Sequence, residues 1–73
     1  MSSKIQDTIT LGEEIDIAVK DNGELSLTSF TVKRIEPDDL TLAYLEAKNG
    51  MFTYLRFKDG AWWTTGLASL KNT

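Results

Sequence analysis

Short runs rich in β-branched, aromatic and leucine residues follow one another along this chain, separated by three clear turn sequences. The turns are Asp21-Asn22-Gly23, Asn49-Gly50 and Asp59-Gly60. Asn-Gly and Asp-Gly tolerate the positive φ angles of tight turns whose twist matches that of paired strands. The pattern predicts a small antiparallel β-protein. Its expected strands are Thr8–Leu11, Ile15–Lys20, Leu25–Glu36, Leu40–Lys48, Met51–Lys58 and Ala61–Leu70.

The boundary between the third and fourth expected strands is Glu36-Pro37-Asp38-Asp39. Proline presets φ for a turn and cannot sit in a central ladder. The fourth strand has a helical alternative over Leu40–Lys48, because its apolar residues do not alternate cleanly. Asn49-Gly50 would then be the C-cap of that helix. Strand is the prediction, and the helix stays open at this point.

Loop length in each hairpin is predicted from the register that gathers apolar residues on one face, since a slip of one residue turns every side chain over. In the first hairpin, a three-residue loop over residues 21–23 forms two apolar pairs, Val19 with Leu25 and Ile17 with Leu27. A two-residue loop would place serine and threonine opposite those β-branched residues. We therefore predict the three-residue loop.

The middle hairpin is predicted to have a two-residue Asn49-Gly50 turn. This register pairs Tyr44 with Leu55, Leu42 with Phe57, Ala47 with Phe52 and Leu45 with Tyr54. A three-residue loop would instead set glutamate opposite Phe52 and threonine opposite Leu45. That alternative is disfavoured because it mixes polar and apolar side chains across the pair.

The last hairpin has two candidate registers. A two-residue Asp59-Gly60 turn pairs Phe57 with Trp62 and is preferred because the two rings then stack. A three-residue loop over residues 58–60 would pair Leu55 with a tryptophan instead.

The long third strand changes its apolar phase from Leu25 and Leu27 to Phe30 and Val32, and again at Ile35. Bulges or a sharp bend produce such shifts, and they curl small sheets into barrels. The predicted fold class is therefore all-β, a five- to six-stranded antiparallel meander closing into a small barrel. Its architecture resembles the SH3-like barrel; the related OB-fold has a helix for which no segment is obvious here. The predicted interior residues are Ile17, Leu27, Phe30, Val32, Leu42, Leu55 and Phe57.

The composition fits one folded domain over residues 1–73, with frayed ends at about 1–6 and 70–73. A hydrophobic fraction of 41% favours a folded chain over a disordered one. The chain has no cysteine and no histidine, which removes disulfides, thiolate zinc sites and the commonest general base. We therefore expect no catalytic activity, no metal site and no cofactor. Without a signal-like or membrane-spanning apolar stretch, a cytoplasmic location is expected.

Alternation along the fifth strand predicts an aromatic and basic face on the side opposite Met51, Leu55 and Phe57. Leu45 and Ala47 are expected to flank this face on one side and Leu67 on the other. Trp62 and Trp63 must point to opposite faces of their strand, and the exposed one is the best anchor candidate. The predicted partner-binding residues are Phe52, Tyr54, Arg56, Lys58 and Trp63.

This face has two interpretations. It is either a second core layer, covered when the sheet closes or by Ile5, Ile9 and Leu11, or an exposed partner site, because contiguous apolar patches on small proteins mark such sites. In the second case Arg56 and Trp63 are expected to form a cation–π pair of about 0.5–1 kcal/mol.

Charge is distributed unevenly although the net charge is only −3. Residues 1–24 carry two lysines against six acidic residues, whereas residues 51–73 carry three basic residues against one aspartate. The predicted acidic surface comprises Glu13, Glu14, Asp16, Asp21 and Glu24. It is either a solvated face or an array that contacts a basic partner, such as a nucleic-acid-handling protein.

The sequence favours a non-catalytic protein-binding module, or a small regulator or inhibitor, that docks on a larger protein. One alternative is a single-stranded nucleic-acid-binding barrel, in which bases stack on aromatic rings beside Arg56 and Lys58. The negative net charge argues against it. Another alternative is a homodimer that forms through the same face or through a free edge strand.

Overall fold

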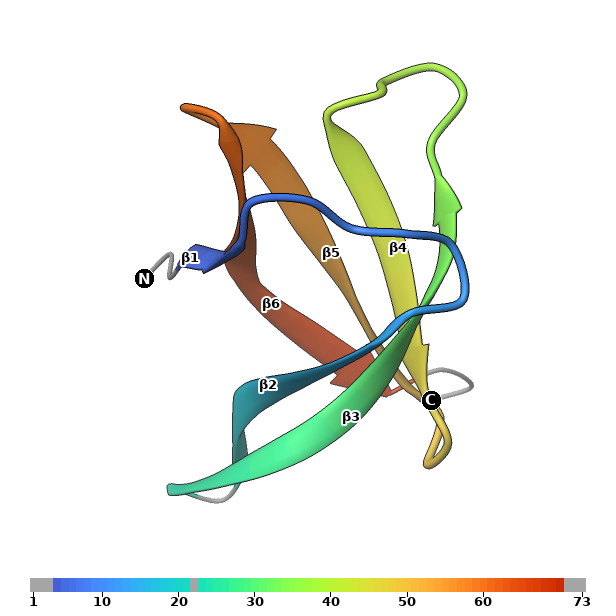
Figure 1. The fold of residues 1–73 in the computed structure, drawn as a ribbon. Helices are drawn as coiled ribbons and strands as arrows, with labels where there is room; N and C mark the ends of the chain where they lie inside the picture. The colour runs from blue at the N-terminus through green and yellow to red at the C-terminus, as the bar shows by residue number, and fades with distance from the viewer. Residues whose placement is uncertain (1–3, 22, 71–73) are drawn as a thin grey trace.

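Hydrogen-bonded ladders join the chain into a single antiparallel sheet that curls into a nearly closed small barrel (Figure 1). The computed structural model describes residues 4–21 and 23–70, with side chains for all of them except residues 20, 21 and 66–70. The strands are β1 (Lys4–Gln6), β2 (Glu14–Asp21), β3 (Glu24–Ile35), β4 (Leu42–Ala47), β5 (Met51–Lys58) and β6 (Ala61–Leu70). Within the described chain there is no helix long and apolar enough to cross a membrane.

The strand order in the sheet is β1-β6-β5-β4-β3-β2. From β2 to β6 the chain therefore runs as a meander of consecutive hairpins, and β1 lies along the far side of β6 (Figure 1). The predicted all-β class, six-stranded meander and small barrel are confirmed. The helical alternative over Leu40–Lys48 is excluded, because residues 42–47 form β4 between two partner strands.

The first strand differs from its prediction. Residues 8–10 have no regular structure and residues 11–12 form a turn, so the predicted strand Thr8–Leu11 is wrong. Lys4–Gln6, within the end that we expected to fray, instead forms β1 and pairs with β6, where Lys4 lies opposite Trp63. The turn at Gly12 has φ of +86°, a conformation that glycine adopts without strain. This turn stops the chain from extending into a strand.

The first hairpin has a two-residue loop, so our three-residue prediction is wrong. Ile17 lies opposite Thr28, and Val19 lies opposite Ser26. Phe30 and Val32 fix this register because both enter the barrel, and unbroken alternation back from them turns Leu25 and Leu27 outward. The hairpin projects from the barrel (Figure 1), and the core at this end is formed from the inner face of β2 by Val19, on the side away from the two leucines. They are 73% and 72% exposed.

The middle hairpin has a three-residue loop over residues 48–50, which is the register that we disfavoured. Tyr44 lies opposite Tyr54, and Leu45 lies opposite Thr53. The loop is closed by Gly50, whose φ is +92° and whose N–H donates to the carbonyl of Ala47 over 3.2 Å. In this register Leu45 faces the interior, and the tyrosine pair lies on the outer face of the sheet.

The last hairpin confirms the preferred prediction. Phe57 lies opposite Trp62, and their ring centroids are 5.3 Å apart. Asp59 and Gly60 have φ of 52° and 77°, the two positive values that a type I′ turn requires. Arg56 lies opposite Trp63, as this turn implies.

The core is formed by side chains that all strands from β2 to β6 contribute. Its buried members are Ile15, Ile17, Val19, Phe30, Val32, Ala43, Leu45, Leu55 and Trp62. The register shifts between Val32 and Arg34, which confirms the second predicted phase change in β3. After this shift Ile35 packs against the core. The first predicted phase change is not a bulge, because β3 pairs with β2 without a register shift there. Leu25 and Leu27 simply face outward, whereas Phe30 and Val32 face inward.

Three of the predicted interior residues are not buried. Leu27 lies outside the barrel, Leu42 is half-buried on the outer face opposite Arg56, and Phe57 is 39% exposed at the end of the last hairpin. Ile17, Phe30, Val32 and Leu55 are buried as predicted.

Candidate partner-binding site

The outer face of β5 carries the predicted aromatic and basic side chains. Thr53 and Leu55 are buried inside, so alternation places Phe52, Tyr54, Arg56 and Lys58 together on the outside. The register brings Tyr44 and Glu46 of β4 beside them, and Trp63 of β6 on the other side. Leu45 and Ala47, the expected flanking residues, face the interior instead. The side chain of Leu67, expected on the other side, lies outside the described part of the structure.

One half of this face is a cluster of three aromatic rings, Tyr44, Phe52 and Tyr54, which we call the ring cluster. The centroid of Tyr44 is 5.7 Å from that of Phe52 and 5.4 Å from that of Tyr54. Phe52 and Tyr54 meet edge to face at 6.4 Å and 87°. Such tilted contacts are the favourable geometry for aromatic pairs. The hydroxyl of Tyr44 also donates to Glu46 over 2.7 Å, which fixes the central ring in place.

Arg34 of β3 extends the ring cluster with a positive charge. Its guanidinium carbon lies 4.3 Å from the ring centroid of Tyr44. Its Nε donates to the carboxylate of Glu36, and this hydrogen bond raises the pKa of Arg34 above its ordinary value. A shallow hollow of about 640 Å³ lies over this half of the face. Its lining residues are Lys33, Arg34, Tyr44, Glu46, Phe52 and Tyr54.

The other half of the face lies around Trp63, the half-buried member of the tryptophan pair. Trp62 belongs to the core, so Trp63 is the anchor candidate of the two. Its indole Nε1 donates to the carbonyl of Lys58 over 2.8 Å, which holds the ring across the last hairpin. A second hollow of about 370 Å³ lies here. It is lined by Arg56, Lys58, Asp59, Trp63, Thr64 and Thr65.

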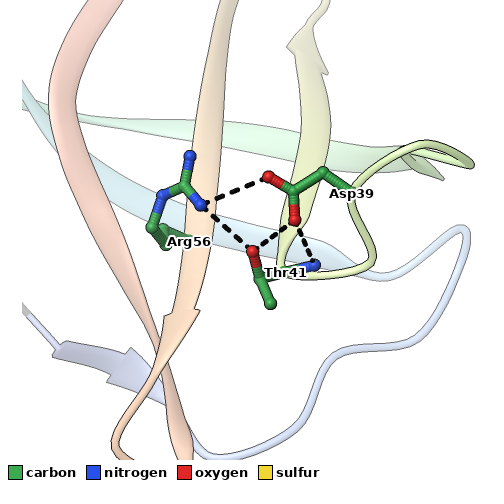
Figure 2. A network of polar contacts seen from close by, with 3 residues as sticks. All are labelled: Asp39, Thr41 and Arg56. Carbon is green, nitrogen blue, oxygen red and sulfur yellow. Dashed lines mark hydrogen bonds and ion pairs between the residues drawn. The ribbon is translucent and has the colours of Figure 1, made fainter.

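A polar network fixes Arg56 beside this second hollow (Figure 2). Its Nη1 donates to Thr41 Oγ1 over 3.0 Å and to Asp39 Oδ2 over 3.3 Å. Asp39 Oδ1 accepts hydrogen bonds from the hydroxyl and from the backbone N–H of Thr41. These bonds from Thr41, and then the bond and charge of Arg56, lower the pKa of Asp39. The guanidinium is thus bound to the turn before β4. Arg56, the expected cation–π partner of Trp63, forms an ion pair with Asp39 instead. The cation–π contact on this face joins Arg34 and Tyr44.

Ile5, Ile9 and Leu11, the described residues expected to cover the face, lie elsewhere. Ile5 and Ile9 pack against the interior core, and Leu11 is 62% exposed. This arrangement differs from one form of the second-core-layer interpretation, in which these three residues cover the outer face.

Of the five acidic residues, the four with described side chains lie at three separate places. Glu13 is half-buried and accepts hydrogen bonds from the Thr10 N–H and from Gln6 Nε2, at 2.9 and 2.8 Å. Asp16 accepts from the hydroxyl of Ser29, and it shares the outer face of β2 with the exposed Glu14. Glu24 is exposed at the tip of the first hairpin, and the side chain of Asp21 lies outside the described residues.

The outer face combines aromatic rings with arginine side chains. Among the residues with described positions, no three carboxylates lie close enough together to hold a metal ion. The ring cluster and Trp63 present apolar rings, and each has a fixed arginine beside it. Comparison of this chain with protein-family models, with curated proteins and with solved structures gave no match.

Proposed function

We propose that this chain is a non-catalytic protein-binding module that acts as a small regulator or inhibitor. It docks on a larger protein through the outer face of β3–β6. One observation carries the proposal: the ring cluster lies on the face of the sheet opposite the interior core, where Arg34 packs on the buried Tyr44 while Phe52 and Tyr54 are half-buried. Tyrosine, tryptophan and arginine dominate the binding energy of protein interfaces, where they act as central anchors.

The fixed geometry of the face supports the proposal. Arg34 is held by Glu36, Arg56 by Asp39, and Trp63 by a backbone carbonyl. A side chain that is already ordered loses little conformational entropy on binding, which favours affinity. From Phe52 to Lys58 the strip runs for about 20 Å at the rise of an extended strand. A strip of that length with its flanking strands is compatible with one side of an ordinary protein interface.

Single-stranded nucleic acid is the less favoured partner. Most affinity for nucleic acid comes from phosphate neutralisation, and the chain has a net charge of −3. Both arginines of the face already pair with carboxylates. Among the described residues, the cations that line the two hollows and form no ion pair are Lys33 and Lys58.

The test begins with affinity capture from native host cells, followed by calorimetry with the purified partner. The double variant Tyr54→Ala, Trp63→Ala removes one anchor from each half of the face. Two interface anchors together are worth about 100-fold or more in affinity. The control Leu11→Ala removes an exposed leucine outside the face and is expected to bind as the wild type does. The fluorescence of the buried Trp62, which all variants retain, reports whether they are folded.

A folded double variant that retains its partner with unchanged affinity would contradict the proposal. Titration with labelled single strands at low salt examines the other class of partner. Binding there, together with no captured protein, would replace the proposed function by nucleic-acid binding.

A further inference from the structure

The β2 strand is an edge of the sheet, and none of the described strands pairs with it on the side away from β3. Its pairing with β3 runs unbroken over Glu14–Asp21, a segment with neither proline nor glycine. Its inward residues Ile15, Ile17 and Val19 are apolar and buried. Natural edge strands are usually blocked by proline, by bulges or by inward charges, because unpaired N–H and C=O groups accept a further strand. Over its described residues β2 has no proline, bulge or inward charge, and the protection that it does have is the charge at positions such as Glu14, Asp16 and Lys20.

The first hairpin determines which backbone groups point to this free edge. In an antiparallel hairpin with a two-residue turn, the residues flanking the turn exchange hydrogen bonds, and every second pair along the ladder does the same. Asp21 and Glu24 flank the turn here. Counting from them, Ala18 and Leu27 are a pair that does not exchange hydrogen bonds. The N–H and C=O of Ala18 therefore point away from β3, toward the free edge.

The residues around Ala18 are complementary to a second copy of themselves. Asp16 and Lys20 stand at two positions before and after Ala18. In an antiparallel alignment that sets Ala18 opposite Ala18 of a second copy, the position of Asp16 lies opposite that of Lys20 in both directions. Opposite charges at directly facing positions stabilise a strand pair.

Apolar residues on the outer face extend the same symmetric row. Ala18 is exposed, and Leu27 beside it is 72% exposed. In the joined sheet, Leu27 and Ala18 of one copy would continue into Ala18 and Leu27 of the other. The hairpin that carries this row projects from the barrel, clear of the hairpin between β4 and β5 (Figure 1).

We propose that this chain forms a two-fold symmetric dimer by antiparallel pairing of β2 with β2 of a second copy, centred on Ala18. Such a pair is isologous, because each copy presents the same surface to the other. The dimer uses a different surface from the proposed docking face, so a dimer can carry two docking faces.

The decisive experiment exchanges the charges and measures the dimer by sedimentation equilibrium. Asp16→Lys and Lys20→Asp each place like charges opposite each other twice, and each is expected to weaken the dimer about tenfold or more. The double variant Asp16→Lys, Lys20→Asp restores the complementarity and is expected to dimerise as the wild type does. An equimolar mixture of the two single variants should form a heterodimer. Ser29→Ala is the matched control, because it removes the hydrogen-bond donor to Asp16 without changing the charge of the edge.

A second variant tests the backbone pairing. Ala18→Pro removes an N–H that points away from β3, so the hairpin keeps its own hydrogen bonds and the dimer should be lost. Ala18→Ser keeps the N–H and is expected to dimerise. Circular dichroism checks that both variants are folded.

A wild type that stays monomeric at about 1 mM would overturn the proposal. A dimer that survives both Ala18→Pro and the single charge variants would also overturn it. A dimer that only the ring-cluster variant Tyr54→Ala dissociates would assign the contact to the docking face instead.

Discussion

Truncation of Leu45 to alanine tests the core and the register of β4 at the same time. Leu45 is 0% exposed and lies opposite Val32 on one side and Thr53 on the other. Removing a fully buried leucine side chain costs about 2–5 kcal/mol, and we expect about 3 kcal/mol here. A domain of this length has a free energy of unfolding of about 4–11 kcal/mol. The variant should therefore fold but lose about a quarter or more of its stability.

The same substitution at Leu27 provides the matched comparison. Its side chain is 72% exposed on the outer face of β3, so truncation leaves no cavity. Surface substitutions of this kind change the free energy of unfolding by about 0.5 kcal/mol or less. The sequence alone had predicted Leu27 in the interior, with Ile17 opposite it, which would have made the two costs equal.

Urea unfolding followed by the fluorescence of the tryptophan pair, of which Trp62 is buried, measures both variants. For so small a protein the slope is about 1 kcal/mol per molar urea, so Leu45→Ala should lower the midpoint by about 3 M. Leu27→Ala should lower it by about 0.5 M or less. Similar shifts for the two variants would refute the register described here. Such a result would favour the three-residue loop that the sequence predicted for the first hairpin.

Three further predictions concern the turns and the outer face. Hydrogen bonds from Thr41 lower the pKa of Asp39, so the ionised Asp39 stabilises the fold at pH values above its unfolded pKa. This contribution is lost as the pH falls below about 4. In Asp39→Asn the urea midpoint should therefore depend less on pH in that range. Gly60→Ala puts a side chain at a φ of 77° and should cost about 1 kcal/mol in thermal unfolding, and a smaller cost would argue against the type I′ turn. Tyr44→Phe removes the hydrogen bond to Glu46 but keeps the ring contacts, so calorimetry should show a free energy of unfolding lower by about 1 kcal/mol. A loss several times larger would mean that the hydroxyl has a further essential role.

The strands and the last hairpin could be predicted because their signals are local. Asp59-Gly60 supplies the two positive φ values of a type I′ turn, and the turn then fixes the Phe57–Trp62 pair. Gly12 acts in the same local way. Its positive φ ends any strand over Thr8–Leu11, and a reading based on β propensity alone does not detect that.

The registers of the other two hairpins could not be obtained by counting apolar pairs. That count assumes that apolar residues gather on one buried face. In this barrel both faces carry them: Leu45 belongs to the interior core, whereas Tyr44, although buried, lies under Arg34 on the outer face, and Leu25 is exposed. The side of each strand that faces the interior depends on how the strands are placed in the barrel. The sequence pattern of a single strand does not contain that information.

The site was predicted where it depends on alternation along one strand. Phe52, Tyr54, Arg56 and Lys58 follow from period two in β5. Tyr44 and Arg34 were missed because they reach the face through the register of β4 and the bulge in β3. Thr41 had a readable signal, since an aspartate two residues before a threonine forms this kind of side-chain turn.

The pairing of β1 with β6 has a consequence for the order in which the barrel assembles during synthesis. Every other strand pair joins neighbours along the chain, whereas Lys4 lies opposite Trp63. The entropy of closing a loop grows with its length, so the hairpins of the meander can form in microseconds while this contact waits. On the ribosome β1 emerges before β2–β6, yet its partner β6 is the last of these strands to be made. The first strand of the barrel is therefore the last to be placed, and the N-terminal segment stays without its partner until β6 has left the ribosome.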